Sequence, residues 1–143
     1  LVDMGVEPFL LGSTLRLVAA QRLVRILCQW CKKPYKPSAQ ELEICLKECY
    51  LKPLPDPQTV MFYKPHGCDK CARTGFSGRK AIYEIYIITK KLKEAIYKYH
   101  HEVGKILEVA KEEGMYPMRS NGWRKVLEGV TSVEEVLEVT LGD

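Results

Sequence analysis

The chain has 143 residues, of which 46% are hydrophobic and 28% charged, and a formal net charge of +4. This size allows one domain or two small ones but not a complete nucleotide-driven motor, and the composition excludes a disordered chain. It has no apolar run of about 18 residues and no recognisable export signal, so the sequence predicts no direct membrane insertion. Reduced cysteines at the spacing of metal ligands then predict a cytoplasmic protein.

The first predicted elements are a turn and a short extended segment over residues 3–11. Ser13 then suits an N-cap position, and apolar residues at helical spacing predict an amphipathic helix over residues 14–27. This helix would lead directly into Cys28. It carries three arginines: Arg16, Arg22 and Arg25. Each could be an exposed side chain without a specific role, or could contact a phosphate or a neighbouring subunit.

Two Cys-x-x-Cys pairs come next, Cys28 with Cys31 and Cys68 with Cys71, separated by 36 residues. A two-residue spacer lets the chain turn back so that both thiolates reach one ion at about 2.3 Å, the distance typical of zinc. The glycines of residues 75–78 allow the positive-φ turns by which such a knuckle leaves its metal. The pattern predicts a structural zinc site with these four cysteines as ligands.

Other uses of the four sulfurs remain open at this point. Two disulfides would suit a secreted chain, and a single Cys-x-x-Cys at a helix start would suit a thioredoxin-like redox pair. The spacer is also longer than the usual zinc-ribbon interval of about 15–20 residues. Something must therefore be inserted between the two pairs.

The inserted segment begins with extended backbone at the proline-flanked residues 34–37. Ser38 and Glu41 then form a capping box that predicts a helix through about residue 50. Cys45 and Cys49 share the inner face of this helix, which favours buried packing residues over metal ligands, although they remain possible replacements for a ligand.

The rest of the chain alternates between strand and helix signals. Residues 60–64 and 80–88 are rich in β-branched and aromatic side chains and predict two strands that pair antiparallel. From Thr89 onward, caps and apolar spacing predict four short helices, the second ending at Gly114, the third starting at Pro117 and the fourth at residues 131–134. The expected fold class is α+β: a short N-terminal amphipathic helix, a tetracysteine subdomain with a small hairpin and an inserted helix, then a helical bundle.

Seven strings, in this order and spacing, resemble one family, the hexameric motor ATPases of type II secretion and type IV pilus assembly: residues 3–10 (DMGVEPFL), 21–28 (QRLVRILC), 67–71 (GCDKC), 74–79 (TGFSGR), 82–84 (IYE), 123–131 (WRKVLEGVT) and 134–137 (EEVL). The resemblance covers the C-terminal part of such a protein. It implies that residues 1–27 are the tail of a RecA-like ATPase domain, 28–88 a tetracysteine zinc-binding subdomain and 89–143 a C-terminal helical subdomain.

The same resemblance implies partners and cofactors. The parent protein would bind ATP and Mg²⁺, pack against neighbouring subunits of a hexameric ring and act on inner-membrane secretion or pilus platform proteins, which would hold it at the inner membrane. The fragment itself has no phosphate loop, because Gly104-Lys105 is followed by Ile106. It is therefore expected to hydrolyse no ATP, and no catalytic residue is expected in it.

The alternative function is a stand-alone zinc module that binds nucleic acid. Summed by segment, residues 1–27 carry about +1, 28–72 about +2, 73–101 about +5 and 102–143 about −4. The basic segment 73–101 is either a partner-facing surface or a solvated one, and it carries no recognisable readout motif, so no nucleic acid is expected as a partner. For the zinc site, the sequence predicts that chelation loosens residues 28–88 and leaves much of 89–143 helical.

Overall fold

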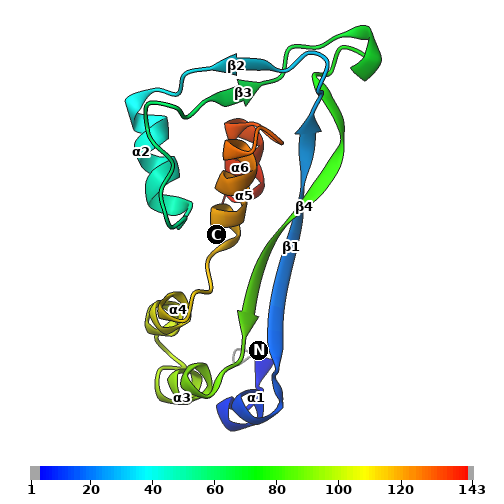
Figure 1. The fold of residues 1–143 in the computed structure, drawn as a ribbon. Helices are drawn as coiled ribbons and strands as arrows, with labels where there is room; N and C mark the ends of the chain where they lie inside the picture. Colours follow the sequence, from blue (N-terminus) through cyan, green and yellow to red (C-terminus); the bar gives the residue numbers. More distant parts are fainter. Residues whose placement is uncertain (1–3, 142–143) are drawn as a thin grey trace. The chain divides into compact units, whose positions relative to one another are not determined.

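The computed structural model describes residues 4–141. Within them the chain forms, in order, α1 (Pro8–Thr14), β1 (Leu17–Leu27), β2 (Lys33–Tyr35), α2 (Ala39–Glu48), β3 (Phe62–Lys64), β4 (Phe76–Ile87), α3 (Lys90–Lys98), α4 (Val103–Glu112), α5 (Met118–Leu127) and α6 (Val133–Val139) (Figure 1). This mixture of helices and short sheets confirms the α+β fold class.

The predicted helix over residues 14–27 is wrong, because this segment is the long strand β1. Backbone hydrogen bonds join its two ends to β4 or the residues beside it: Ile88 N–H donates to Arg16 O at 2.9 Å, and Cys28 N–H donates to Gly75 O at 2.9 Å. These bonds make β1 and β4 an antiparallel pair. The apolar spacing suited a helix, but a strand partner about sixty residues later decides the backbone conformation, which no local pattern reveals.

The start of the chain also differs from the prediction. Residues 8–14 are the helix α1, whose first turn contains Pro8, instead of an extended segment. Ser13 lies inside this helix and donates its hydroxyl hydrogen to Leu10 O at 3.1 Å, so it is not an N-cap. A proline suits the first turn of a helix because its missing N–H has no intrahelical acceptor there, and this was the available signal.

The two strands predicted over residues 60–64 and 80–88 exist as β3 and β4, but they do not pair with each other. Strand β3 instead pairs antiparallel with β2, with Tyr35 opposite Phe62, and β4 pairs with β1. The extended backbone expected at residues 34–37 therefore supplies the partner of β3. In Figure 1 these two strands run side by side, and the inserted helix α2 follows β2.

The chain divides into two compact units. The first comprises the described residues of Leu1–Ala20 and Glu84–Tyr116. Here α3 packs against both α1 and α4, around a core built from Ile88, Leu92, Ala110 and Met115. The second unit comprises Gln21–Tyr83 and the described residues of Pro117–Asp143.

The second unit holds the larger core. Its buried residues come from α2, β3, α5 and α6 and include Cys45, Phe62, Trp123 and Val136. Trp123 is 1% exposed, and its ring centroid lies 6.3 Å from that of Phe62. Trp123 is thus a core residue, as the sequence predicted.

The predicted helices at the C-terminal end are confirmed as α3 to α6. Thr89 accepts the cap hydrogen bond of α3 from Leu92 N–H, and Ser132 accepts that of α6 from Glu135 N–H. Contacts join α3 to α4 in the first unit and α5 to α6 in the second. The functional division at residues 27/28 and 88/89 stays a prediction. No helix within residues 4–141 has the length and apolarity that crossing a bilayer requires.

Candidate metal centre

The first cysteine pair forms a tight turn at the end of β1. Cys28 directly follows the strand, and its carbonyl oxygen accepts from Cys31 N–H at 3.2 Å and from Lys32 N–H at 2.9 Å. These two bonds reverse the chain within four residues. Both thiols can then face the same point, as the two-residue spacer predicts.

The second pair forms the matching turn. Residues Asp69–Cys71 make one turn of 3-10 helix, and Ala72 and Arg73 adopt positive φ angles of 49° and 61°. Arg73 N–H donates back to Cys68 O at 2.8 Å and closes the loop. Positive φ at two consecutive residues with side chains is unusual. Here it turns the backbone so that Arg73 N–H reaches Cys68 O.

Gly75 links the two pairs. Its N–H donates to Cys71 Sγ at 3.2 Å, and its carbonyl oxygen accepts from Cys28 N–H at 2.9 Å. Its φ is +80°, and an added Cβ would lie 2.5 Å from Pro65 Cβ. Any side chain at this position would push Pro65 or break the link, so the expected need for a glycine beyond the second knuckle is confirmed.

The four sulfurs lie at distances that suit one ion. Cys28, Cys31, Cys68 and Cys71 place their Sγ atoms within 4.8 Å of one another. Three of the sulfur–sulfur distances are 3.9 Å for Cys28 to Cys68, 3.9 Å for Cys31 to Cys71 and 3.8 Å for Cys68 to Cys71. A tetrahedron with metal–sulfur bonds of about 2.3 Å has edges of about 3.8 Å. The donor set therefore fits a tetrahedral metal ion such as zinc.

The same distances argue against the disulfide alternative. A disulfide bond brings two sulfurs to about 2.05 Å, roughly half the separation seen here. All six cysteines are free thiols. The thioredoxin-like alternative also fits poorly, because both Cys-x-x-Cys pairs meet at one point instead of one pair standing at the start of an α-helix.

Hydrogen bonds to Cys71 prepare it for the thiolate state. Burial alone would raise the pKa of this thiol. Hydrogen bonds from the N–H groups of Cys68 and Gly75 and from the neighbouring thiols outweigh burial and lower the pKa to about 6. Burial instead raises the pKa of Cys31 to about 11. Hydrogen bonds to the charged form thus favour a thiolate at Cys71 more than at Cys31.

The remaining candidate residues lie away from this cluster. Cys45 and Cys49 are fully buried in the core beside Phe62 and Trp123, so they are packing residues as predicted, and burial raises the pKa of Cys45 to about 12. Gly104 and Lys105 lie inside α4, and Lys105 forms an ion pair with Glu102 at 2.6 Å. Gly104 and Lys105 are therefore part of a regular helix and not of a phosphate loop.

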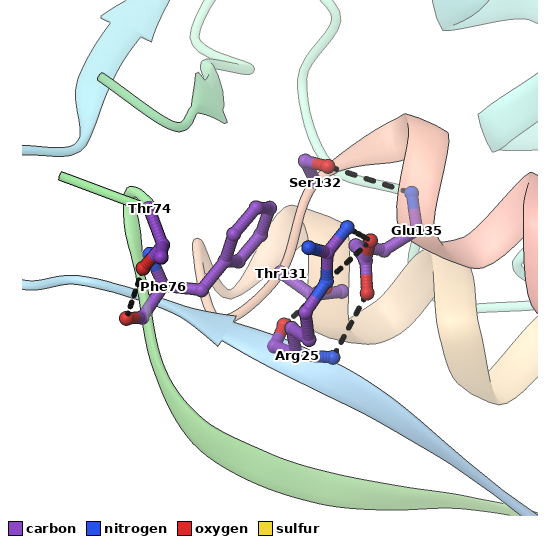
Figure 2. A network of polar contacts seen from close by, with 6 residues as sticks. All are labelled: Arg25, Thr74, Phe76, Thr131, Ser132 and Glu135. Atoms are coloured by element: carbon purple, nitrogen blue, oxygen red, sulfur yellow. Dashed lines mark hydrogen bonds and ion pairs between the residues drawn. The ribbon is translucent and has the colours of Figure 1, made fainter. Parts of the chain in front are cut away.

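Arg25, whose role the sequence left open, forms a partly buried network of polar contacts three residues before Cys28 (Figure 2). Its guanidinium forms an ion pair with the buried Glu135 and lies 4.1 Å from the centroid of the Phe76 ring. The hydrogen bond between Arg25 and Glu135 lowers the pKa of that carboxyl, against the effect of its burial. Sequence analysis missed this contact because the two residues are 110 positions apart.

Comparison with known proteins agrees with these features. A profile of the family described as type II/IV secretion system protein matches residues 1–138. The chain belongs to this family. It is 42% identical over 140 residues to the type II secretion system protein E of Pseudomonas aeruginosa, covering 98% of this chain and 26% of that protein. This confirms the resemblance noted in the sequence.

Two further relatives of the secretion family carry pilus names. The chain is 40% identical over 144 residues to the type IV pilus assembly ATPase TfpB of Acinetobacter baylyi, covering 96% of this chain and 22% of the relative. It is 37% identical over 140 residues to the type IV pilus assembly ATPase PilB of Thermus thermophilus, covering 97% and 15%. The chain thus spans about a quarter or less of the curated relatives it matches.

Proposed function

We propose that Cys28, Cys31, Cys68 and Cys71 bind one structural Zn²⁺ ion. The observation that carries this proposal is the set of sulfur–sulfur distances near 3.8 Å, which equals the edge of a zinc–thiolate tetrahedron. Four protein sulfurs leave no open position for water or substrate, so the ion holds the two turns together and performs no chemistry.

We also propose that the chain is the C-terminal metal-binding and helical region of a motor ATPase in type II secretion or type IV pilus assembly. Two of the relatives described above are named pilus assembly ATPases. In the parent protein this region would pack against neighbouring subunits of a hexameric ring and transmit nucleotide-dependent movement to inner-membrane platform proteins from the cytoplasmic side. ATP and Mg²⁺ belong to the parent, because this chain has no G-x-x-x-x-G-K-[ST] motif.

An exposed apolar strand face in the first unit supports the packing role. Ile85 and Ile87 are 44% and 56% exposed, and Leu17 is 51% exposed. At the end of β4 these isoleucines alternate with Tyr86 and with Ile88, the residue after the strand, both of which pack into the core of the unit. Ile85 and Ile87 therefore lie on the face of the strand that points away from this core. Exposed apolar side chains on one face of a strand pair are suited to contact with another protein surface.

No observation favours the nucleic-acid alternative. The basic segment 73–101 is divided between the two compact units, with residues 73–83 in the second and 84–101 in the first. Two of its lysine and arginine side chains are also engaged locally: Lys91 with Glu112 at 2.6 Å and Arg73 with Asp69 at 3.3 Å.

Elemental analysis of the purified chain tests the zinc proposal. We expect one zinc per chain for the wild type and for Cys45→Ser, and none for Cys68→Ser. A folded wild-type chain that contains no metal after purification without chelators would overturn the proposal.

A second experiment tests the role in the parent protein. We expect Cys68→Ser in the full-length protein to reduce secretion or pilus assembly in a strain that depends on it, while Cys45→Ser retains most of that output. Normal output with Cys68→Ser would show that the metal subdomain is dispensable for transmission.

A further inference from the structure

The turn between α5 and α6 contacts the strand residues that immediately precede the first cysteine pair. Leu27 N–H donates to Val130 O at 2.8 Å, and Thr131 Oγ1 donates to Arg25 O at 2.8 Å. Arg25 N–H donates to the Glu135 carboxylate at 3.0 Å. Because β4 covers one edge of β1, these three bonds cover the opposite edge just before Cys28. Figure 2 shows the two of these bonds that Arg25 makes.

The same turn is held from the other side of the cysteine pair. Lys32, which directly follows Cys31, donates from Nζ to Gly129 O at 2.6 Å and places this ammonium 4.5 Å from the centroid of the Tyr63 ring. Gly129 sits against that ring: an added Cβ would lie 2.9 Å from Tyr63 Cδ2 and 3.3 Å from Lys32 Nζ. The turn therefore touches the residues next to both ends of the Cys28–Cys31 pair.

These contacts hold the backbone on both sides of the first cysteine pair. Cys28 N–H donates to Gly75 O, and Gly75 N–H donates to Cys71 Sγ, so these bonds connect Cys28 to the second cysteine pair. The preceding residue, Leu27, is hydrogen-bonded to Val130 of the turn. Tetrahedral zinc tolerates errors of only about 0.2 Å in ligand distance, so groups that orient the ligands contribute to metal affinity.

We infer that residues 129–135, the α5–α6 turn together with the first turn of α6, form a positioning element of the metal centre. Its main contact to the first cysteine pair is the hydrogen bond from Lys32 Nζ to Gly129 O. This inference rests on the proposed zinc binding. By thermodynamic reciprocity, if the docked turn raises metal affinity, then the bound metal stabilises docking of the turn by the same factor. The centre would thereby hold α5 and α6, and not only the two cysteine loops.

Substitution of Lys32 by Met tests the inference while keeping most of the aliphatic stem on Tyr63. Lys33→Met is the matched control, because Lys33 is the next residue and is exposed, whereas Lys32 is half-buried. Zinc affinity is measured by competition with a chromophoric chelator, and the thiolate-to-metal absorption of bound Co²⁺ reports ligand geometry. We expect Lys32→Met to bind zinc about tenfold or more weakly, within the range of lost ligand-orienting contacts, and Lys33→Met to match the wild type.

A second measurement covers the case in which Lys32→Met disturbs the fold. In the wild-type chain, removal of the metal should increase amide hydrogen exchange at Leu27, whose N–H is bonded to Val130, and leave α4 in the first unit unchanged. Equal zinc affinity of Lys32→Met and wild type, or unchanged exchange at Leu27, would overturn the inference and leave zinc binding intact. A wild-type chain that binds no zinc or cobalt would overturn both.

Discussion

At the scale of single residues, the Arg25–Glu135 pair shows how a half-exposed arginine can stabilise the fold by pairing with a buried carboxylate. The Arg25 side chain is 50% exposed, but its partner carboxylate is 6% exposed and receives hydrogen bonds from both the guanidinium and the backbone of Arg25. A carboxylate buried to this extent is tolerated only because it is paired. Removing one partner therefore matters more than the surface position of Arg25 suggests.

This pair predicts a specific pH dependence. The pKa of Glu135 is lowered in the folded state, chiefly by the Arg25 hydrogen bond. Its ionised form therefore stabilises the fold above the unfolded-state pKa of about 4.3, and this contribution is lost as the pH falls through that value toward the lower folded-state pKa. We expect Glu135→Gln to lower the free energy of unfolding at pH 7 by about 1–3 kcal/mol and to weaken its acid dependence.

Urea denaturation between pH 3 and 7 measures both effects. Glu112→Gln is the control, because Glu112 pairs with Lys91 where both side chains are more than half exposed. Water and salt screen such an exposed pair, so it contributes little to stability. If the unfolding free energy of Glu135→Gln falls with decreasing pH as steeply as that of the wild type, then Glu135 does not contribute to this pH dependence.

The cysteines make a second prediction at this scale. Cys68→Ser should abolish metal binding and greatly destabilise the second unit, because three thiolates and a hydroxyl hold zinc poorly. Cys45→Ser should keep the metal and cost about 1–3 kcal/mol, the effect of an unpaired buried hydroxyl. Metal content with chemical denaturation of both variants checks this, and similar behaviour of the two would contradict the assignment of Cys45 to the core.

At the scale of elements, α5 holds the second unit together. Ser120 Oγ and Arg124 Nε donate to Cys49 O at 3.0 and 3.1 Å, and Trp123 Nε1 donates to the Glu48 carboxylate at 2.8 Å. The last carbonyl groups of a helix have no hydrogen-bond donors within that helix. Side chains of α5 supply these donors at the C-terminal end of α2. On its other side α5 contacts α6 through Gly122.

Two helix glycines predict opposite responses to alanine. A Cβ at Gly122 in α5 would lie 2.5 Å from Val136 Cγ1 of α6, whereas a Cβ at Gly104 in α4 would have no atom within 4 Å. We expect Gly122→Ala to destabilise the chain by about 1–3 kcal/mol through overpacking. Gly104→Ala should stabilise it by about 0.5–1 kcal/mol, because alanine loses less backbone entropy in a helix. Thermal unfolding measures both, and a stabilised Gly122→Ala variant would contradict the close α5–α6 contact.

At the scale of the whole molecule, the two compact units change the expected effect of metal removal. From the sequence, residues 28–88 would loosen and 89–143 would stay helical. In the structure, α5 and α6 belong to the unit that holds the cysteines, whereas α3 and α4 belong to the other. Metal removal should therefore loosen α2, α5 and α6 together.

We expect chelation to reduce the helical circular-dichroism signal by up to about half, the share of helical residues in α2, α5 and α6. Hydrogen exchange should increase in these three helices and remain slow in the amides of α3 and α4 that face the Leu92 core. Re-addition of zinc should restore the signal. Uniform loss across all helices would show that the two units unfold as one.

Features that depend on neighbours along the chain could be predicted from the amino-acid sequence. The two Cys-x-x-Cys pairs turn within four residues, and the Ser38–Glu41 capping box forms with both of its hydrogen bonds. The glycine and proline positions that bound α4 and α5 act through their own backbone angles. Local rules suffice here because each interaction joins residues only a few positions apart.

Strand pairing and the grouping of helices into cores depend instead on contacts between distant segments. Residues 14–27 have helical apolar spacing, yet β1 forms because β4 offers backbone partners along it. Lys32 and Gly129 lie 97 positions apart, and no local pattern connects them. Such contacts require the closure of long loops and the selection of one strand register among many. Their free energy therefore depends on the whole fold and cannot be predicted from any single segment.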